Sequence, residues 1–261
     1  MSLRINKDNI FFILTEDRYS VAKKIDTHMS KDFSFYVKAK VNSEFLEVGK
    51  EHFLFSRNGM HSGVSIFKSE DDKIHVVYQW WVKSNNSDKY EVKMVGQWIT
   101  DELANEYNEY IMICDNDDEK NIKCYFNNIL VGEINFKDGE KKGYEESFYW
   151  FGCGSMLASE KEHMHIGDFD YELSFLINKK LELSEVNEIS KNYESYTFEI
   201  YNGLRRLKDD FYLNNDLNNR RILKENFAFF CDFNQYTRYK IWDMTFSGNY
   251  PQVYIEDNIY Y

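Results

Sequence analysis

Residues 31–41 read KDFSFYVKAKV, and this stretch decides the fold class. Apolar and more polar side chains alternate along it: Phe33, Phe35, Val37, Ala39 and Val41 against Ser34, Tyr36, Lys38 and Lys40. Because successive side chains of a β-strand point to opposite faces, the alternation predicts a strand with one buried face and one face in water.

Similar runs follow this strand along the chain. Residues 53–68 predict two strands around a turn at Asn58-Gly59, and residues 73–82 predict a pair with residues 90–99. A three-strand meander is predicted over residues 109–114, 121–126 and 129–136, and its second connection, Asn127-Asn128, tolerates the positive φ of a type I′ turn. Ten or more antiparallel strands predict an all-β sandwich of two stacked sheets.

Composition agrees with a β-rich domain and excludes some partners. The chain has 261 residues, 18% aromatic residues and a single proline, so Asn, Asp and Gly must make its turns. Its formal net charge is −12, which argues against nucleic acid or an anionic membrane as a main partner, because both need a basic face. No run approaches the roughly 20 apolar residues of a membrane span.

The pattern changes in the last third of the chain. Ser184 can cap a short helix that carries Val186 and Ile189, and the spacing of Leu204, Leu207 and Phe211 predicts a second helix. β character returns from residue 227. We therefore expect one domain over residues 1–261, with a helical insertion at about 184–213 and C-terminal strands in 227–256 that complete the sandwich.

The N-terminal apolar run and the cysteines bear on localisation. The run from Ile10 to Leu14 is too short for a secretory signal, which favours a cytoplasmic protein. The cysteines (Cys114, Cys124, Cys153 and Cys231) form no CxxC pair and lie in apolar runs, which predicts buried free thiols. A Cys114–Cys124 bridge across a hairpin is the alternative.

The order of five segments resembles a known family. KDFSFYVKAKV, FLFSRNGMHSGVSI, IKCYFNNILVGEINF, FYWFGCG and HIGDFDYELSFLINKKLELSEVNEI together look like a laminin-G-like domain of the concanavalin A-type jelly roll, with Asn127-Asn128 where that family usually has Asp-Gly. FAFFCDFNQYTRYKIWDMTFSGNY (227–250) is similar to the family's opening strand. The resemblance implies that the tail supplies the first strand of the same sandwich, as in a circular permutation; a second, truncated domain is the alternative.

Asp168, Asp170 and Glu172 share one face of a predicted strand. They resemble the E-x-D-x-E motif of laminarinase-type glucanases, which would make Asp168 the nucleophile, Asp170 the helper and Glu172 the acid/base. Asp replaces the first Glu, and Cα atoms four residues apart on a flat strand lie about 13 Å apart, whereas retaining chemistry needs carboxyls about 5–5.5 Å apart. We therefore favour a structural Asp170 with solvated neighbours over a catalytic role, and the enzyme stays an alternative.

Metal sites are weighed at two places. His163 and His165 share a strand face but have no third ligand in the motif. The loop 115–121, DNDDEKN, offers Asp115 and Asp117 for Ca²⁺, but it is not an EF-hand, because Lys120 stands at the glycine position and Phe126 at the bidentate glutamate position.

The tryptophans carry the binding hypothesis. Ile74, Val76, Tyr78 and Trp80 share one face of their strand and predict core, whereas His75, Gln79 and Trp81 share the other, and Trp98 on the neighbouring strand can lie on either face. Trp150 and Trp242 are expected in the core. A flat indole flanked by hydrogen-bonding side chains suits a neutral sugar.

The sequence and the resemblance together predict a non-catalytic carbohydrate-binding, lectin-like module of the kind attached to polysaccharide-processing enzymes or glycosyltransferases. A protein–protein interaction domain of laminin-G type is the first alternative. A glycoside hydrolase or lyase that uses residues 168–172 is the second.

Overall fold

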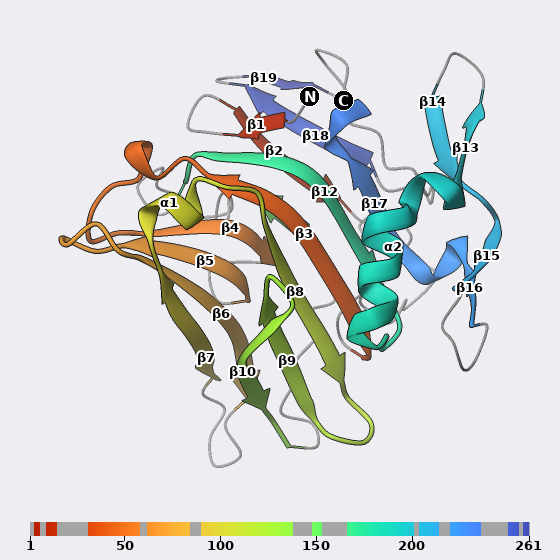
Figure 1. Ribbon diagram of the computed structural model, residues 1–261, viewed down its shortest axis with the longest axis horizontal. Helices are drawn as coiled ribbons and strands as arrows, with labels where there is room; N and C mark the ends of the chain where they lie inside the picture. Colours follow the sequence, from red (N-terminus) through yellow and green to blue (C-terminus); the bar gives the residue numbers. More distant parts are fainter. Residues whose placement is uncertain are drawn as a thin grey trace.

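The fold was analysed in a computed structural model. It describes residues 3–5, 9–14, 31–57, 62–83, 90–137, 148–152, 166–200, 204–213, 220–235, 250–255 and 258–260. These form two large antiparallel sheets and few helices, which confirms the predicted all-β jelly-roll sandwich (Figure 1). The turn expected at Asn58-Gly59 lies outside the described residues.

The first sheet, sheet A, contains the strand that opened the sequence argument, now β3 (Phe33–Val41). Its strand order is β1 (Leu3–Ile5), β12 (Phe169–Ile177), β3, β8 (Asn108–Asp115), β9 (Asn121–Phe126) and β10 (Ile129–Asn135). β17 (Phe227–Asp232) also pairs with β12, along the edge that β1 uses further up the strand.

The second sheet, sheet B, has eight strands. Their order is β19 (Asn258–Tyr260), β18 (Tyr250–Ile255), β2 (Asn9–Leu14), β11 (Phe148–Phe151), β4 (Glu51–Arg57), β5 (Gly63–Lys68), β6 (Ile74–Lys83) and β7 (Tyr90–Ile99). The C-terminal segments therefore join both sheets, β17 beside β12 and β18 beside β2. That residues 1–261 form a single domain stays a prediction.

The predicted meander and its turn are confirmed. β8, β9 and β10 pair in sequence, and Asn127 and Asn128 have φ values of 49° and 67°, as a type I′ turn requires. Cys114, Cys124 and Cys231 are free and buried, so the alternative Cys114–Cys124 bridge is wrong. Cys153 lies outside the described residues.

A bulge in β12 divides its side chains between two cores. Phe169 and Tyr171 face the core between the sheets. The register with β3 shifts between Tyr171 and Leu173, so that Leu173, Phe175 and Ile177 face the outer side of sheet A. An extra residue in a strand reverses the face of every later side chain, which explains this change.

The outer side of sheet A is covered over that half. Helix α2 (Leu183–Tyr196) lies across it and contributes Val186 and Ile189 to a second apolar core, as Figure 1 shows for the helix. The expectation that Ser34 and Tyr36 face water is therefore wrong: both are buried. Ser34 Oγ donates to Lys179 O at 2.9 Å, and Tyr36 donates to Glu109 at 3.0 Å.

The helical predictions were partly right. α2 forms, but Glu182 caps it in place of Ser184, in a capping box in which the Glu185 side chain accepts from the Glu182 amide at 2.8 Å. A further short helix, α1 (Asp101–Ala104), is capped by Thr100. Among the described residues no helix has the length and apolar character needed to cross a membrane.

The second helix, expected around Leu204 to Phe211, is wrong. The chain forms two hairpins there: β13 (Thr197–Ile200) pairs with β14 (Leu204–Leu207), and β15 (Asp210–Tyr212) pairs with β16 (Arg221–Leu223). Leu207 and Phe211 are buried as the spacing suggested. They lie on two strands joined at Lys208-Asp209, and a turn between short strands produces the same four-residue spacing as a helix.

The second core should contribute strongly to stability. Phe230 of β17 is fully buried and stacks on Phe175 with ring centroids 5.5 Å apart. We expect Phe230→Ala to lower the free energy of unfolding by about 3–5 kcal/mol, measured by urea denaturation. Tyr212→Ala, at an exposed ring, should change it by less than about 0.5 kcal/mol. Equal effects of the two substitutions would show that β17 and α2 do not share a core.

Candidate functional site: an aromatic platform at the edge of sheet B

The outer face of sheet B at β6 and β7 holds the predicted binding residues. Ile74, Val76, Tyr78 and Trp80 lie in the core between the sheets, as predicted. His75, Gln79 and Trp81 therefore lie on the opposite face. His75 pairs with Trp98 of β7 in the register of the two strands.

His75 and Trp98 form a stacked pair. Their ring centroids are 4.4 Å apart and their planes differ by 12°. Phe67 of β5 meets the indole edge-on at 6.5 Å. Trp98 is still 52% exposed, although tryptophan is highly buried on average. An indole held flat on one side and exposed to solvent is the most distinctive surface feature of this face.

Gly96 makes room for this stack. A Cβ built at Gly96 would lie 2.8 Å from His75 Nε2 and 2.6 Å from the backbone oxygen of Val76. The imidazole therefore occupies the space that any other residue at position 96 would fill. We call Gly96, His75 and Trp98 the platform.

Burial changes the acid–base behaviour of His75. Removal of the ring from water disfavours the charged imidazolium and lowers the pKa of His75 below its usual value. The ring is therefore neutral at pH 7, and the platform carries no charge of its own there.

Gln79 and Trp81 do not belong to the platform. Gln79 is 3% exposed, and its amide donates to Glu51 at 2.7 Å and to Ser65 at 3.2 Å, so the expectation that it is an exposed hydrogen-bonding neighbour of Trp81 is wrong. Trp81 is half-buried, and its backbone amide donates to Ser62 at 3.2 Å. It lies six residues from His75 along β6, which is about 20 Å.

Sequence reasoning missed Met94 and Gly96. Met94 is exposed and lies on the same face of β7 as Gly96 and Trp98, because the three are two residues apart. The sequence signal that could have found them is this two-residue spacing on a predicted strand.

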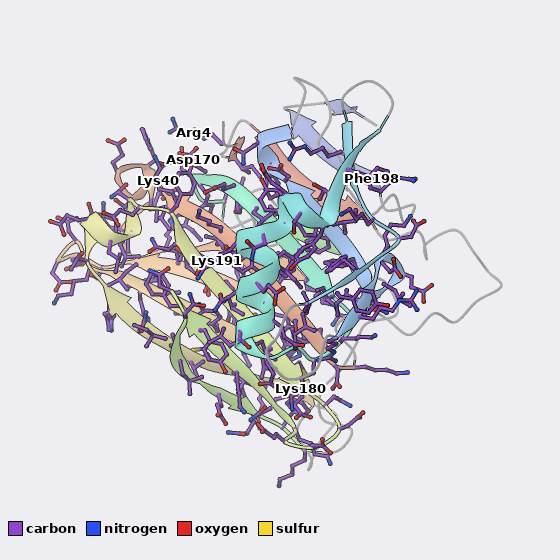
Figure 2. All side chains as sticks on the ribbon, turned by 45° about the vertical axis from the view of Figure 1, so that its right-hand side comes forward. Arg4, Lys40, Asp170, Lys180, Lys191 and Phe198 are labelled. Carbon is purple, nitrogen blue, oxygen red and sulfur yellow. The ribbon has the colours of Figure 1, made fainter. Side chains whose placement is uncertain are left out.

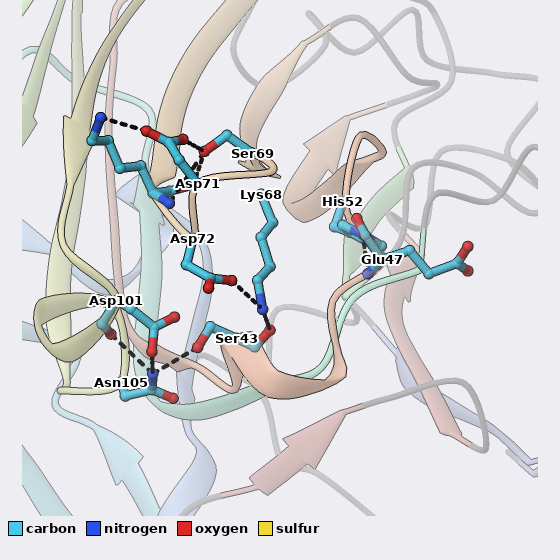
Figure 3. Close-up of polar contacts among 10 residues, drawn as sticks. Ser43, Glu47, His52, Lys68, Ser69, Asp71, Asp72, Asp101 and Asn105 are labelled. Carbon is cyan, nitrogen blue, oxygen red and sulfur yellow. Dashed lines mark hydrogen bonds and ion pairs between the residues drawn. The ribbon is translucent and has the colours of Figure 1, made fainter.

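Polar loops flank the platform at the start of β6 and at the end of β7. Ser69, Asp71 and Lys73 form a closed turn before β6, in which Ser69 Oγ donates to Asp71 at 2.5 Å and Lys73 N donates to Ser69 Oγ at 3.1 Å (Figure 3). After β7, Asn105 of the α1 segment donates to Asp101 and to Ser43 Oγ, the latter at 2.7 Å. These contacts fix both loops relative to the strand ends.

The three carboxylates of residues 168–172 are ion-paired on sheet A. Asp168 is only 6% exposed, and it accepts from Arg4 Nε and Nη2 at 2.9 and 2.8 Å and from Asn42 Nδ2 at 2.7 Å. Asp168 is therefore a structural aspartate, and the expectation that it is solvated is wrong. The position before β12 accounts for the difference, because it brings Asp168 against both β1 and the 42–46 loop. A structural role for Asp170 stays a prediction.

Asp170 and Glu172 have lysine partners on β3. Lys40 Nζ lies 3.0 Å from Asp170, and Lys38 Nζ lies 2.9 Å from Glu172 (Figure 2 labels Lys40 and Asp170). Each carboxylate of the glucanase-like motif thus has a cationic partner. The resemblance implies two carboxyl groups that act together on a substrate. The contacts of these three carboxylates do not support that role.

The acidic loop after β8 is closed by its own contacts. Asp115 accepts from Lys180 Nζ at 2.5 Å and from the amide of Asp118 at 2.9 Å. Burial alone would raise the pKa of Asp115, but these bonds outweigh it and lower the pKa. Asp117 accepts from Asn116 at 3.4 Å. Within the part of the chain that the structure describes, no three His, Cys, Asp or Glu side chains are grouped as metal ligands.

Some predicted residues cannot be placed. His163, His165 and Trp242 lie outside the described residues, and Trp150 is placed only through its backbone in β11.

Comparisons with known proteins add little to this geometry. No family model and no curated protein matches the chain. A heptameric SAP-like pentraxin from Limulus polyphemus is 10% identical, with a TM-score of 0.46 over 71% of this chain and 77% of that one. The binding domain of botulinum neurotoxin DC, solved in complex with SialylT, is also 10% identical, with a TM-score of 0.46 over 99% of this chain and 63% of that one.

A third similar structure is of botulinum neurotoxin type C, whose cell entry depends on two ganglioside molecules. It is 11% identical, with a TM-score of 0.46 over 99% of this chain and 67% of that one. At such identities and TM-scores, these similarities say nothing about the ligand of this chain.

The Asp168 cluster generates a stability prediction. Asp168→Ala would leave Asn42 and Arg4 without their acceptor, so we expect the free energy of unfolding to fall by about 1–3 kcal/mol in urea denaturation. Glu172→Ala, at a half-exposed ion pair, should cost at most about 1 kcal/mol. A larger loss at Glu172 than at Asp168 would contradict this assignment.

The platform generates a pH prediction. Because the pKa of His75 is lowered in the folded state, its contribution to stability is complete above the unfolded value of about 6.5 and is lost as pH falls toward the native value. An NMR titration of the imidazole should give a midpoint below 6.5, and Trp98→Ala should raise it by uncovering the ring. Tyr212→Ala is the control and should leave it unchanged. A wild-type midpoint at or above 6.5 would refute the burial argument.

Proposed function

We propose that this protein is a non-catalytic carbohydrate-binding module that binds a neutral glycan on Trp98. The observation that carries the proposal is an indole that is 52% exposed and held in position by the stacked ring of His75. A rigid aromatic face loses little conformational freedom when a ligand covers it, so most of the contact energy is available for binding.

Sugar recognition needs an apolar surface beside hydrogen-bonding groups. The exposed indole supplies the surface on which the C–H face of a sugar ring can lie. Ile74 pairs with Ile99, so the polar turn before β6 and the Thr100–Asp101 cap after β7 lie next to Trp98. These loops supply hydroxyl, carboxylate and ammonium groups that could orient sugar hydroxyls.

The charge of the protein favours a neutral ligand at this place. The chain has a net charge of −12 and the imidazole of the platform is neutral at pH 7, so the electrostatics favour a neutral sugar over an anionic one, and the Lys73 ammonium beside the platform is already paired with Asp71. The ion pairs of Asp168, Asp170 and Glu172 favour a binding function over hydrolysis.

Trp98 is a better platform than Trp81. Trp81 is half-buried, whereas Trp98 stacks on His75 and is still 52% exposed. The binding site that the sequence placed around Trp81 is therefore proposed at Trp98, His75 and Gly96.

A glycan array followed by calorimetry tests the proposal. We expect the wild type to bind neutral glycans and Trp98→Ala to bind them about ten- to a hundredfold more weakly, because the stacking surface is worth about 1–3 kcal/mol. Gly96→Ala should weaken binding as well, since its Cβ displaces His75. Tyr212→Ala removes an equally exposed ring elsewhere and should bind like the wild type. Wild-type binding that survives Trp98→Ala would remove Trp98 from the site, and an empty array would end the lectin proposal.

A protein partner is the second candidate function. Ile129 and Leu130 at the start of β10 are 68% and 48% exposed, one on each face of the strand, and exposed large apolar side chains at a sheet edge are typical of contact surfaces. β10 also ends the strand order of sheet A. If the array is empty, Ile129→Ser/Leu130→Ser is the variant to compare with wild type in partner capture.

A further inference from the structure

A polar pocket lies on sheet A, where β3 begins, β12 ends and α2 begins. It is an open depression with a volume of about 420 Å³. Every lining residue carries a charge or an amide: Asp32, Asn178, Lys179, Lys180, Glu182 and Arg220. Figure 2 shows Lys180 near the lower end of α2. No aromatic ring lines the pocket, so it differs in kind from the platform.

Two of its cations are held by buried acids. Lys180 Nζ lies 2.5 Å from Asp115, and Arg220 Nη1 lies 3.1 Å from Glu185, and both acids are buried. The Glu185 contact uses one nitrogen of the guanidinium, and among the described residues no other acceptor contacts its remaining donors, which can bind a ligand. Each buried acid thus fixes the position of its cation through one of the nitrogen atoms or protons of that cation.

Lys179 is the third cation, and none of the described residues forms an ion pair with its ammonium group. Its backbone oxygen accepts from Ser34 Oγ at 2.9 Å, which fixes the main chain at the pocket wall. Asp32 accepts from the amide of Asn116 through Oδ1 at 2.7 Å. Its second carboxylate oxygen is an acceptor for a hydroxyl group.

We infer that this pocket binds a hydroxylated carboxylate, that is, an acidic sugar of the uronate class. Arg220 and Lys179 supply the donors that a carboxylate requires, and guanidinium matches its geometry in a bidentate manner. Asp32 supplies an acceptor that a hydroxyl group requires. Because no aromatic or aliphatic residue lines the pocket, it offers no apolar surface to an apolar ligand.

The inference is independent of the proposed function. The platform lies on sheet B at β6 and β7, whereas the pocket lies on sheet A beside α2, and the two share no residue. The ligands also differ in charge. The acidic-sugar site can therefore fail while Trp98 binds neutral glycans, and the reverse also holds.

Matched ligands test the inference on the full chain. Methyl β-D-glucuronide and methyl β-D-glucoside differ only at C6, where one has a carboxylate and the other a hydroxymethyl group. In NMR titrations we expect the glucuronide to shift the amide signals of residues 178–182 at millimolar concentration, and the glucoside to leave them unchanged. Acetate, which has the charge without the hydroxyls, should bind more weakly than the glucuronide.

Two substitutions and one control locate the site. Lys179→Gln, which breaks no recorded ion pair, should weaken glucuronide binding about tenfold or more. Arg220→Gln should abolish it, but it also removes the partner of Glu185, so Lys179→Gln is the decisive variant. Arg221→Gln is the control, because the neighbouring Arg221 pairs with Asp210 and does not line the pocket. Equal binding of glucoside or acetate, or unchanged glucuronide binding by Lys179→Gln, would overturn the inference.

Discussion

The bulge in β12 is the constraint on which the rest of sheet A depends. Before it, Phe169 and Tyr171 point into the sandwich; after it, Leu173, Phe175 and Ile177 point out of it. Three large apolar side chains on an outer face must be covered, because exposed patches of that size are costly. The chain that follows β12 does this with α2, the two small hairpins and β17, which together bury the outer face. One extra residue thus explains why a two-sheet sandwich has a third, partial layer.

The features predicted correctly from sequence are local ones, and those predicted wrongly depend on contacts with distant parts of the chain. Strands with regular alternation, such as β6, and turns with a fixed conformational demand, such as Asn127-Asn128, are local features, and their prediction succeeded. The burial of Ser34 and Tyr36 depends on a helix about 150 residues away in sequence, which no local pattern contains. The prediction of a helix over Leu204 to Phe211 is wrong for a related reason, because a helix and a strand–turn–strand segment give the same spacing of apolar residues.

The candidate site shows the same division between local and distant information. Alternation correctly placed His75 and Trp81 on the outer face of β6, but it could not show that Glu51 and Ser65 enclose Gln79. The contact between His75 and Trp98 depends on the register of β6 with β7 and on the missing side chain of Gly96. Likewise, the burial of Asp168 depends on its contacts with Arg4 and Asn42, which lie more than 120 residues away in sequence.

The buried thiols of the meander give the chain two internal reporters. Burial raises the pKa of Cys124 well above its usual value, and the nearby Cys114 adds to this, while the thiolate is the form that reacts with alkylating reagents and oxidants. Cys114 and Cys124 lie on the adjacent strands β8 and β9, and neither side chain is accessible in the folded state. Modification of either thiol therefore requires that these strands separate or that the sheet opens locally. The rate at which the two sulfurs react would measure how often the centre of sheet A opens in the native protein.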